Sequence, residues 1–187
     1  MEIVEPLYFS ERGQWRNWLE NNHDKEREAW LVFPKKSSRK KRIPYNDAVE
    51  EALCFGWIDS IIKPIDDEKY AQRFSPRSPK SNYSQANIER LRWLSKNKLL
   101  HPTIERSVEE IIKKPYVFPA DILEEIKKDK KAWDNFQRFS DSYKRIRIAY
   151  IDNSRARQEY FKKRLSYFIK KTRENKLIGY GGIDKYY

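Results

Sequence analysis

The sequence predicts an α+β fold, in which a small antiparallel sheet packed with helices is followed by a C-terminal helical portion. Short apolar runs that suit strands lie in the first half of the chain, at 28–34 and 57–62. Apolar residues at helical spacing dominate the second half. The chain has 187 residues, enough for a sizeable core, and its six Trp, twelve Tyr and nine Phe would build much of it.

A helix and a strand are predicted near the start of the chain. Trp15, Trp18 and Leu19 recur at helical spacing, and Ser10 is placed to cap that helix. The run 28–34 is rich in large apolar residues, which is typical of a strand. We therefore expect a helix to lead into the first strand.

A basic loop and a second helix are expected next. Residues 35–42 carry six Lys and Arg and no apolar residue, which predicts an exposed loop. The following helix would begin near 44–47, with Asn46 as its cap. It would end at Gly56, where a positive φ is expected.

An antiparallel hairpin is predicted from two apolar runs, 57–62 and 69–74, which are separated by a turn at 64–68. Side chains alternate between the two faces of a strand. One face should therefore carry Tyr70, Gln72 and Phe74, and the other Ala71 and Arg73.

The remaining chain should be helical. Ser84 is expected to cap a helix, and another helix is expected at 103–113. A Pro-containing linker at 114–119 suggests two parts, an α+β domain at 1–114 and a helical portion at 115–187, with one compact unit of both as the alternative. The helices expected in the second part are 120–129, 131–139 and one long helix at about 142–174.

Composition narrows the function classes. Cys54 is the single cysteine, so no internal disulfide is expected, and His23 and His101 lie far apart along the chain. No metal ligand spacing is present, so neither a metal nor a cofactor is expected. The first residues lack the features of a signal peptide, and we expect a cytoplasmic protein without a membrane span.

The catalytic motifs of common enzymes are absent. The sequence contains neither G-x-S-x-G nor a glycine-rich phosphate loop, and it has only five glycines. Cys54 lies on the apolar face of a predicted helix, where packing is its usual role. No catalytic residue is predicted; an enzyme that uses Cys54, Asp59 or Lys80 is kept as an alternative.

The most concentrated polar signal runs from 52 to 87. Cations, hydroxyls and amides follow the predicted hairpin, and a helix N-terminus with free N–H groups comes next. This combination suits a carboxylate, a phosphate or another anion. The predicted ligand-binding residues are Trp57, Asp59, Arg73, Ser75, Arg77, Lys80, Ser84 and Asn87.

Two other interpretations stay open. The same residues could form a structural brace, with Arg73 paired to Asp59 across the sheet and Ser84 acting only as a helix cap. Alternatively, the net charge of +12 could serve non-specific nucleic-acid binding. The basic loop 35–42 and the segment 141–176, with twelve Lys/Arg against four Asp/Glu, are the candidate surfaces for that role.

Unusual strings at 45–52, 52–59 and 73–77, together with Lys80, Ser81, Ser84 and Asn87, resemble the YdeI/OmpD-associated family of bacterial proteins. The resemblance extends over about 9–176. It implies an accessory protein connected with bacteriocin or antimicrobial-peptide protection and with stress responses, and it brings no catalytic residue. The partner that we expect from the polar segment at 52–87 is an anionic small molecule or a peptide.

Overall fold

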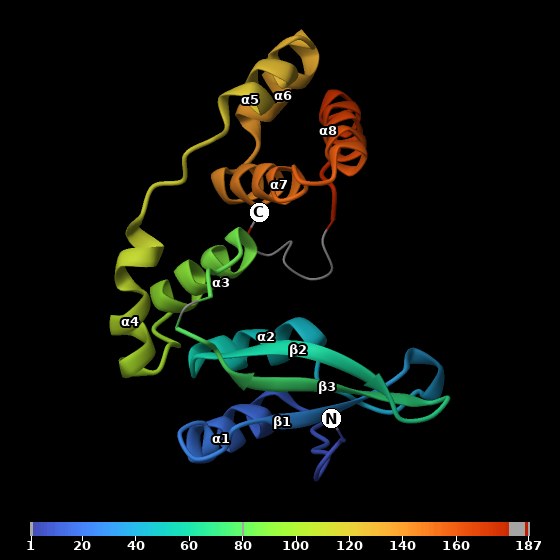
Figure 1. Ribbon diagram of the computed structural model, residues 1–187, viewed down its shortest axis with the longest axis vertical. Coiled ribbons are helices and arrows are strands. Elements are labelled where there is room, and N and C mark those ends of the chain that lie inside the picture. Colours follow the sequence, from blue (N-terminus) through green and yellow to red (C-terminus); the bar gives the residue numbers. More distant parts are fainter. Residues whose placement is uncertain (1, 80, 180–185, 187) are drawn as a thin grey trace. The chain divides into compact units, whose positions relative to one another are not determined.

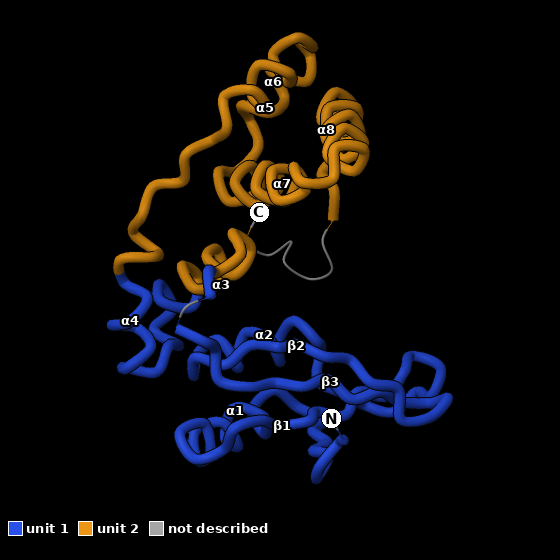
Figure 2. The backbone as a smooth tube through the Cα atoms, in the orientation of Figure 1, with its two compact units in different colours: residues 1–82, 94–109 blue, residues 83–93, 110–187 orange. Residues whose placement is uncertain are grey.

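The structure is a computed structural model that describes residues 2–79, 81–179 and 186. It contains two compact units, shown in different colours in Figure 2. Unit 1 comprises residues 1–82 and 94–109, and unit 2 comprises residues 83–93 and 110–187. The predicted α+β class is confirmed, because the sheet lies in unit 1 and the C-terminal helices lie in unit 2. The domain boundary expected after residue 114 stays a prediction.

The sheet of unit 1 is antiparallel and has the strand order β1-β3-β2 (Figure 1). Its strands are β1 (Ala29–Pro34), β2 (Trp57–Pro64) and β3 (Lys69–Pro76). The strand expected at 28–34 and the hairpin expected at 57–74 are thereby confirmed. Leu7 makes an isolated parallel bridge with Leu31, so the N-terminal segment covers part of the outer edge of β1.

The register of the sheet fixes which side chains share a face. Ala29 lies opposite Phe74 and Phe33 lies opposite Tyr70, so the even-numbered residues of β3 face one side, as predicted. The register between β2 and β3 shifts between Asp59 and Ile62, where β2 contains an irregularity.

Helices α1 (Arg12–Asn22) and α2 (Tyr45–Cys54) pack against the same face of the sheet. The Trp15 ring of α1 lies 5.4 Å from the Phe74 ring, and the Tyr45 ring of α2 lies 6.2 Å from the Phe33 ring. The indole of Trp15 also donates a hydrogen bond to the Ala48 carbonyl of α2, at 3.0 Å. Aromatic packing therefore holds both helices to the sheet.

The predicted caps of these two helices are wrong by one or two residues. The N-cap of α1 is Glu11 rather than Ser10, because Glu11 forms a capping box with Gln14, whose side chain accepts a hydrogen bond from the Glu11 N–H at 3.2 Å. The N-cap of α2 is Pro44 rather than Asn46. In both cases the sequence offered a capping side chain, but the chain enters the helix earlier or later than that residue.

Gly56 ends the turn after α2 with a φ of +75°, as predicted. A Cβ atom added there would lie 2.7 Å from Cδ1 of Ile104 in helix α4 (Pro102–Lys113). The Gly56 carbonyl accepts a hydrogen bond from the Arg77 N–H at 2.9 Å. The position therefore favours glycine for its backbone conformation, and a larger residue would in addition require the end of the Ile104 side chain to shift.

Unit 2 is built from helices, and most of its buried residues form one core rich in aromatic side chains. The helices are α5 (Ala120–Lys127), α6 (Lys130–Arg138), α7 (Asp141–Asp152) and α8 (Gln158–Arg173), with the N-terminal part of α3 (Gln85–Lys96). Phe136, Tyr143 and Phe168 are buried in this core with Ile122 and Ile148. No helix in the described part of the chain is both long and apolar enough to cross a membrane.

The single long helix expected at 142–174 is wrong. The structure has α7 and α8 instead, with a turn at residues 153–157 between them. The buried Ser154 hydroxyl donates to the Ile151 carbonyl at 2.6 Å, and Arg155 binds Asp121 of α5 through two hydrogen bonds of 2.8 Å. The local hydrogen bond of Ser154 and the tertiary contact of Arg155 together favour the turn over the uninterrupted helix that local propensity allows.

Candidate functional site

Trp57, at the start of β2, is part of the unit 1 core. Its side chain is 1% exposed, and the indole N–H donates to the His23 carbonyl at 3.0 Å. The Trp18 ring meets it edge-on at a centroid distance of 5.8 Å. A ligand in this structure would therefore have no direct access to Trp57.

Asp59 lies two residues further along β2 and accepts a hydrogen bond from the Tyr45 hydroxyl of α2. It is opposite Phe74 in the sheet register, so it shares the face that carries the helices. Arg73, next to Phe74, points to the opposite face. The Asp59–Arg73 ion pair considered in the brace interpretation is therefore wrong.

Arg73 pairs instead with Glu28, which comes just before β1. Its Nε donates to the Glu28 carboxylate at 2.7 Å, and this hydrogen bond lowers the pKa of Glu28 below its ordinary value. A second guanidinium nitrogen lies 3.4 Å from the hydroxyls of both Ser60 and Ser75. The structure thus brings Arg73 and Ser75 together, but the Glu28 carboxylate already neutralises the charge of Arg73.

Arg77 fastens the loop that follows β3. Its guanidinium donates to the carbonyls of Ser81, at 3.0 Å, and of Asn82. This loop belongs to unit 1, and the guanidinium holds its backbone. Lys80, the remaining predicted cation, lies outside the described residues.

Ser84 and Asn87 belong to unit 2, at the N-terminus of α3. The Ser84 hydroxyl accepts a hydrogen bond from the Asn87 N–H at 3.3 Å, so the predicted cap is confirmed. The Asn87 side chain in turn accepts from Arg90 at 2.8 Å. The groups that were expected to meet a ligand here serve the helix itself.

The eight predicted residues therefore have different surroundings. Trp57 is packed in the core, Asp59 and Arg73 point to opposite faces of the sheet, and Arg77 holds a loop. Ser84 and Asn87 form the start of a helix in the other unit. The burial of Trp57 and the Ser84 cap agree with the structural-brace interpretation, whereas the Asp59–Arg73 pair that it included is not formed.

His23 and His101, far apart along the chain, are neighbours in unit 1. Their ring centroids lie 5.0 Å apart, and both rings approach Phe55. Each Nδ1 already has an oxygen partner, at Leu19 and Thr103 respectively. Among the described residues, no three His, Cys, Asp or Glu side chains come together in a group that could hold a metal ion.

Cys54, the candidate nucleophile of the enzyme alternative, is sealed in the core of unit 1. Its side chain is 0% exposed, and burial raises the pKa of the thiol to about 12. The reactive form of cysteine is the thiolate, which is scarce far below such a pKa. The surroundings of Cys54 are those of an inert packing residue.

We expect iodoacetamide to leave Cys54 unmodified in the folded protein at about pH 8, because the thiol is protonated and inaccessible. In denaturing urea the same residue should be alkylated once. Mass spectrometry of the intact chain measures both results. Rapid alkylation of the folded protein would contradict the buried placement and would return Cys54 to the list of candidate nucleophiles.

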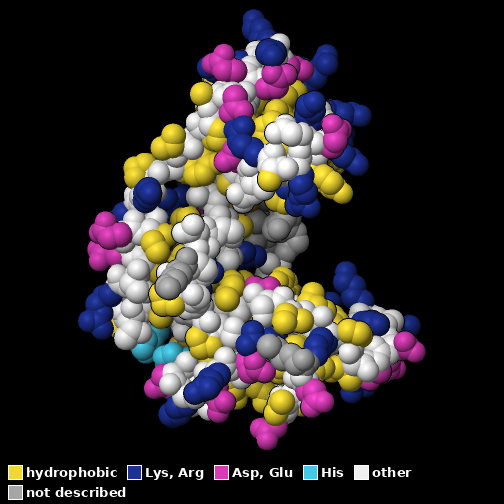
Figure 3. Space-filling model, viewed as in Figure 1, with side chains coloured by type: hydrophobic (Ala, Val, Ile, Leu, Met, Phe, Trp, Pro, Cys, Tyr) yellow, Lys and Arg dark blue, Asp and Glu magenta, His cyan; other side chains and the backbone are white. Residues whose placement is uncertain are grey.

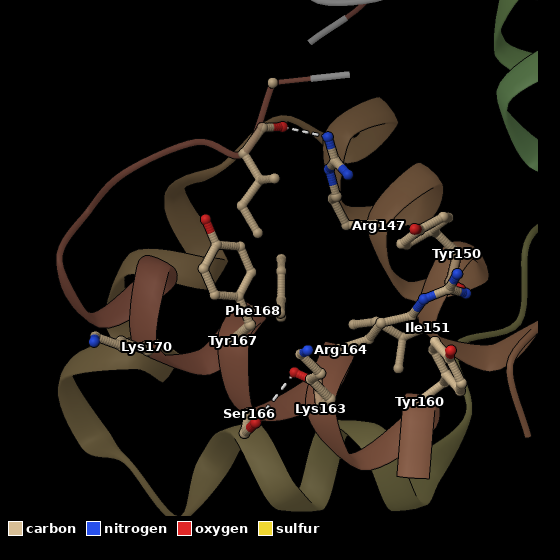
Figure 4. A pocket seen from close by; sticks show the side chains of 12 residues that line it. Arg147, Tyr150, Ile151, Tyr160, Lys163, Arg164, Ser166, Tyr167, Phe168 and Lys170 are labelled. Atoms are coloured by element: carbon tan, nitrogen blue, oxygen red, sulfur yellow. Dashed lines mark hydrogen bonds between the residues drawn. The ribbon is translucent and has the colours of Figure 1, made fainter. Parts of the chain in front are cut away.

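A groove with a volume of about 830 Å³ lies between α7 and α8 in unit 2 (Figure 4). We call it the α7–α8 groove. Its floor is apolar and includes Ile151 and Phe168, both from the core of unit 2. Its polar lining consists of the cations Arg147, Lys163, Arg164 and Lys170, the tyrosines Tyr150, Tyr160 and Tyr167, and Ser166.

The charges of the α7–α8 groove are of one sign. Among the described residues that line it, none carries a carboxylate. Lys163 and Lys170 are exposed and form no ion pair with any described residue. Two unpaired cations beside apolar walls create a site that favours an anion.

The other two cations of the groove are held in place by their neighbours. The Arg164 guanidinium carbon lies 3.9 Å from the centre of the Tyr150 ring, and one of its nitrogens donates to the Tyr150 carbonyl at 3.0 Å. Arg147 is 4% exposed and donates to the Ile178 carbonyl, a contact drawn in Figure 4. The groove therefore presents ordered guanidinium groups as well as free lysines.

Glu89 of α3 binds two arginines of unit 2, one on its own helix and one on α7. Its buried carboxylate accepts hydrogen bonds from Arg145 of α7 at 2.7 and 2.9 Å, and from Arg92 of α3 at 2.7 Å. These bonds raise the pKa of the Arg145 guanidinium. Glu89 thus ties α7, one wall of the groove, to α3.

The groove was not predicted from the sequence, although part of its signal is visible there. The basic excess of 141–176 was assigned to a nucleic-acid surface. Tyr160 and Tyr167, on the same segment, are 55% and 50% exposed. Tyrosines seven residues apart with lysines at the intervening helical positions would have indicated a mixed aromatic and cationic face.

Two family models match the chain. The model described as "Domain of unknown function (DUF8412)" matches residues 7–107, and the model described as "Bacteriocin-protection, YdeI or OmpD-Associated" matches residues 115–175. The expected resemblance to the YdeI/OmpD-associated family is confirmed, on the segment that contains α5 to α8. No curated protein and no solved structure matches the chain.

Proposed function

The chain belongs to the family described as a domain of unknown function (DUF8412), and from that premise we propose a non-enzymatic binding protein that holds an anionic ligand in its α7–α8 groove. The observation that carries this proposal is the single sign of charge in the groove, with Lys163 and Lys170 unpaired above an apolar floor. Most of the residues that line the groove lie within the segment that matches the YdeI/OmpD-associated model.

The proposed ligand has an apolar or aromatic part as well as negative charge. An inorganic ion would use only the cations and would leave the tyrosines and the apolar floor in contact with water. Small-molecule sites typically combine apolar walls with a few placed polar groups, as this groove does. A ligand of mixed character therefore matches more of the lining than a simple anion.

The family model that matches residues 115–175 has bacteriocin protection in its description. A protective or stress-related role is therefore part of this proposal. The net charge of +8 over residues 141–176, from twelve Lys/Arg and four Asp/Glu, argues against direct capture of a cationic peptide by the groove. We propose that any protective role proceeds through an anionic partner. A cytoplasmic location would supply many such partners and stays a prediction.

The anionic aromatic probe 1-anilinonaphthalene-8-sulfonate tests the proposal through its fluorescence on binding. We expect Lys163→Gln together with Lys170→Gln to weaken binding roughly tenfold, since each exposed charge contact is worth on the order of 0.5–1 kcal/mol. The matched control is Lys130→Gln with Lys131→Gln on α6, which removes the same charge from exposed positions outside the groove.

The control should bind the probe as the unchanged protein does. Equal weakening in both double variants would mean that net charge alone attracts the probe, and the proposal would fail. Near-ultraviolet circular dichroism should show unchanged tertiary packing in every variant, because loosened proteins also bind this probe.

A further inference from the structure

We infer that the α7–α8 groove binds single-stranded nucleic acid, with bases stacked on its tyrosines and phosphates on its lysines. This inference rests on the proposed function and names the ligand class of the same groove. It draws on the order of side chains along α8, the exposure of the rings and the distribution of charge. Figure 3 shows Lys and Arg side chains gathered over α8, with hydrophobic side chains beside them.

Aromatic and basic residues alternate along the face of α8 that lines the groove. Tyr160 is followed by Lys163 and Arg164, then by Tyr167, then by Lys170. Residues three, four and seven apart lie on one face of a helix, and seven residues span about 10 Å. The face therefore offers two rings with cations between and beyond them, which suits a chain of alternating bases and phosphates.

Each tyrosine of this face has a cation near its ring and is still widely exposed. The Arg157 guanidinium carbon lies 5.1 Å from the Tyr160 ring centre, and the Lys171 ammonium lies 5.7 Å from that of Tyr167. The two side chains are 55% and 50% exposed. A cation over one face of a ring leaves the other face for a base, and it adds positive charge next to the stack.

Charge and rings together favour a single strand over other polyanions. An acidic peptide would satisfy Lys163 and Lys170 but has no regular supply of planar groups for the tyrosines. In a duplex the faces of the bases are stacked on one another, so they are closed to aromatic side chains. A single strand presents open base faces and a phosphate at each nucleotide, and so uses both features of the groove.

The inference is tested on the full-length protein with a fluorescently labelled oligothymidylate of about twelve nucleotides, a length within the usual site size of single-strand binding modules. Anisotropy measures binding across a range of salt concentrations. If Lys163, Arg164 and Lys170 each neutralise a phosphate, the logarithm of the association constant should fall against log salt with a slope of about −2.

Two pairs of variants separate stacking from charge. Tyr160→Leu with Tyr167→Leu should weaken binding by at least about tenfold, whereas the matched Tyr160→Phe with Tyr167→Phe should retain it, because the ring is what stacks. Lys163→Gln with Lys170→Gln should reduce the salt slope to about −0.7, while Lys35→Gln with Lys36→Gln, in the exposed basic loop of unit 1, should leave it unchanged.

The oligonucleotide should also displace 1-anilinonaphthalene-8-sulfonate from the groove. If the probe binds as proposed but the oligonucleotide does not displace it, the nucleic-acid inference is overturned while the proposed function stands. Equal affinity for a duplex of the same length, or equal displacement by polyglutamate, would overturn the inference as well. Failure of the probe to bind at all would remove both proposals.

Discussion

Replacing Trp57 with alanine should lower the free energy of unfolding of unit 1 by about 3–5 kcal/mol, the range for truncating a fully buried aromatic side chain. The side chain is 1% exposed, and its loss would also leave the His23 carbonyl without its indole donor. Urea denaturation followed by circular dichroism measures the change. Ligand binding in the α7–α8 groove should be unaffected under conditions in which the variant is folded.

The matched control for this prediction is Trp57→Phe. It keeps an aromatic ring against Trp18 but removes the N–H group, so we expect a loss of only about 1–2 kcal/mol. A Trp57→Ala protein of unchanged stability that has lost affinity for an anionic ligand would contradict the core assignment. It would instead support the ligand-binding role that the sequence predicts for Trp57.

Replacing Glu89 with alanine should destabilise unit 2 by about 3 kcal/mol, the lower end of the range for breaking a buried ion pair. The Glu89 side chain is 4% exposed, but those of Arg92 and Arg145 are 24% and 23% exposed, so water compensates part of the loss. Hydrogen exchange of backbone amides in α7 should report the change, because α7 would lose its tie to α3.

Two controls define what Glu89 contributes. Glu125→Ala removes the exposed ion pair with Lys128, and we expect a change of only about 0–1 kcal/mol from it. Glu89→Gln keeps an acceptor for the two arginines but no charge, and its effect should lie between those of the other two variants. If Glu89→Ala were as mild as Glu125→Ala, the buried carboxylate would not organise unit 2.

The two family matches assign different parts of the molecule to different models. The strings that carry the YdeI/OmpD resemblance lie within residues 7–107, which match the domain of unknown function, whereas the YdeI/OmpD-associated model matches residues 115–175. The α7–α8 groove lies mainly in the second segment. The functional proposals therefore concern the C-terminal helices rather than the polar string at 52–87.

Several features followed from the sequence because local chemistry decides them. Alternating and helical apolar periods predicted the hairpin, the first strand and most helices, and the need for positive φ identified Gly56. The Ser84 cap and the burial of Cys54 were equally local conclusions. Each depends on a residue and its near neighbours, which is information that a single sequence contains.

Two features could be found only from the tertiary structure: which charged side chains pair with each other, and where the candidate binding groove lies. Arg73 pairs with Glu28 rather than Asp59 because adjacent residues of a strand point to opposite faces, and the exact register sets which faces meet. The helix expected at 142–174 breaks at 153–157, where Arg155 finds Asp121 thirty-four residues away. The break turns the chain back, so that α8 lies beside α7 and the groove forms between them. A single sequence does not reveal this groove, because its walls are brought together only by the tertiary fold.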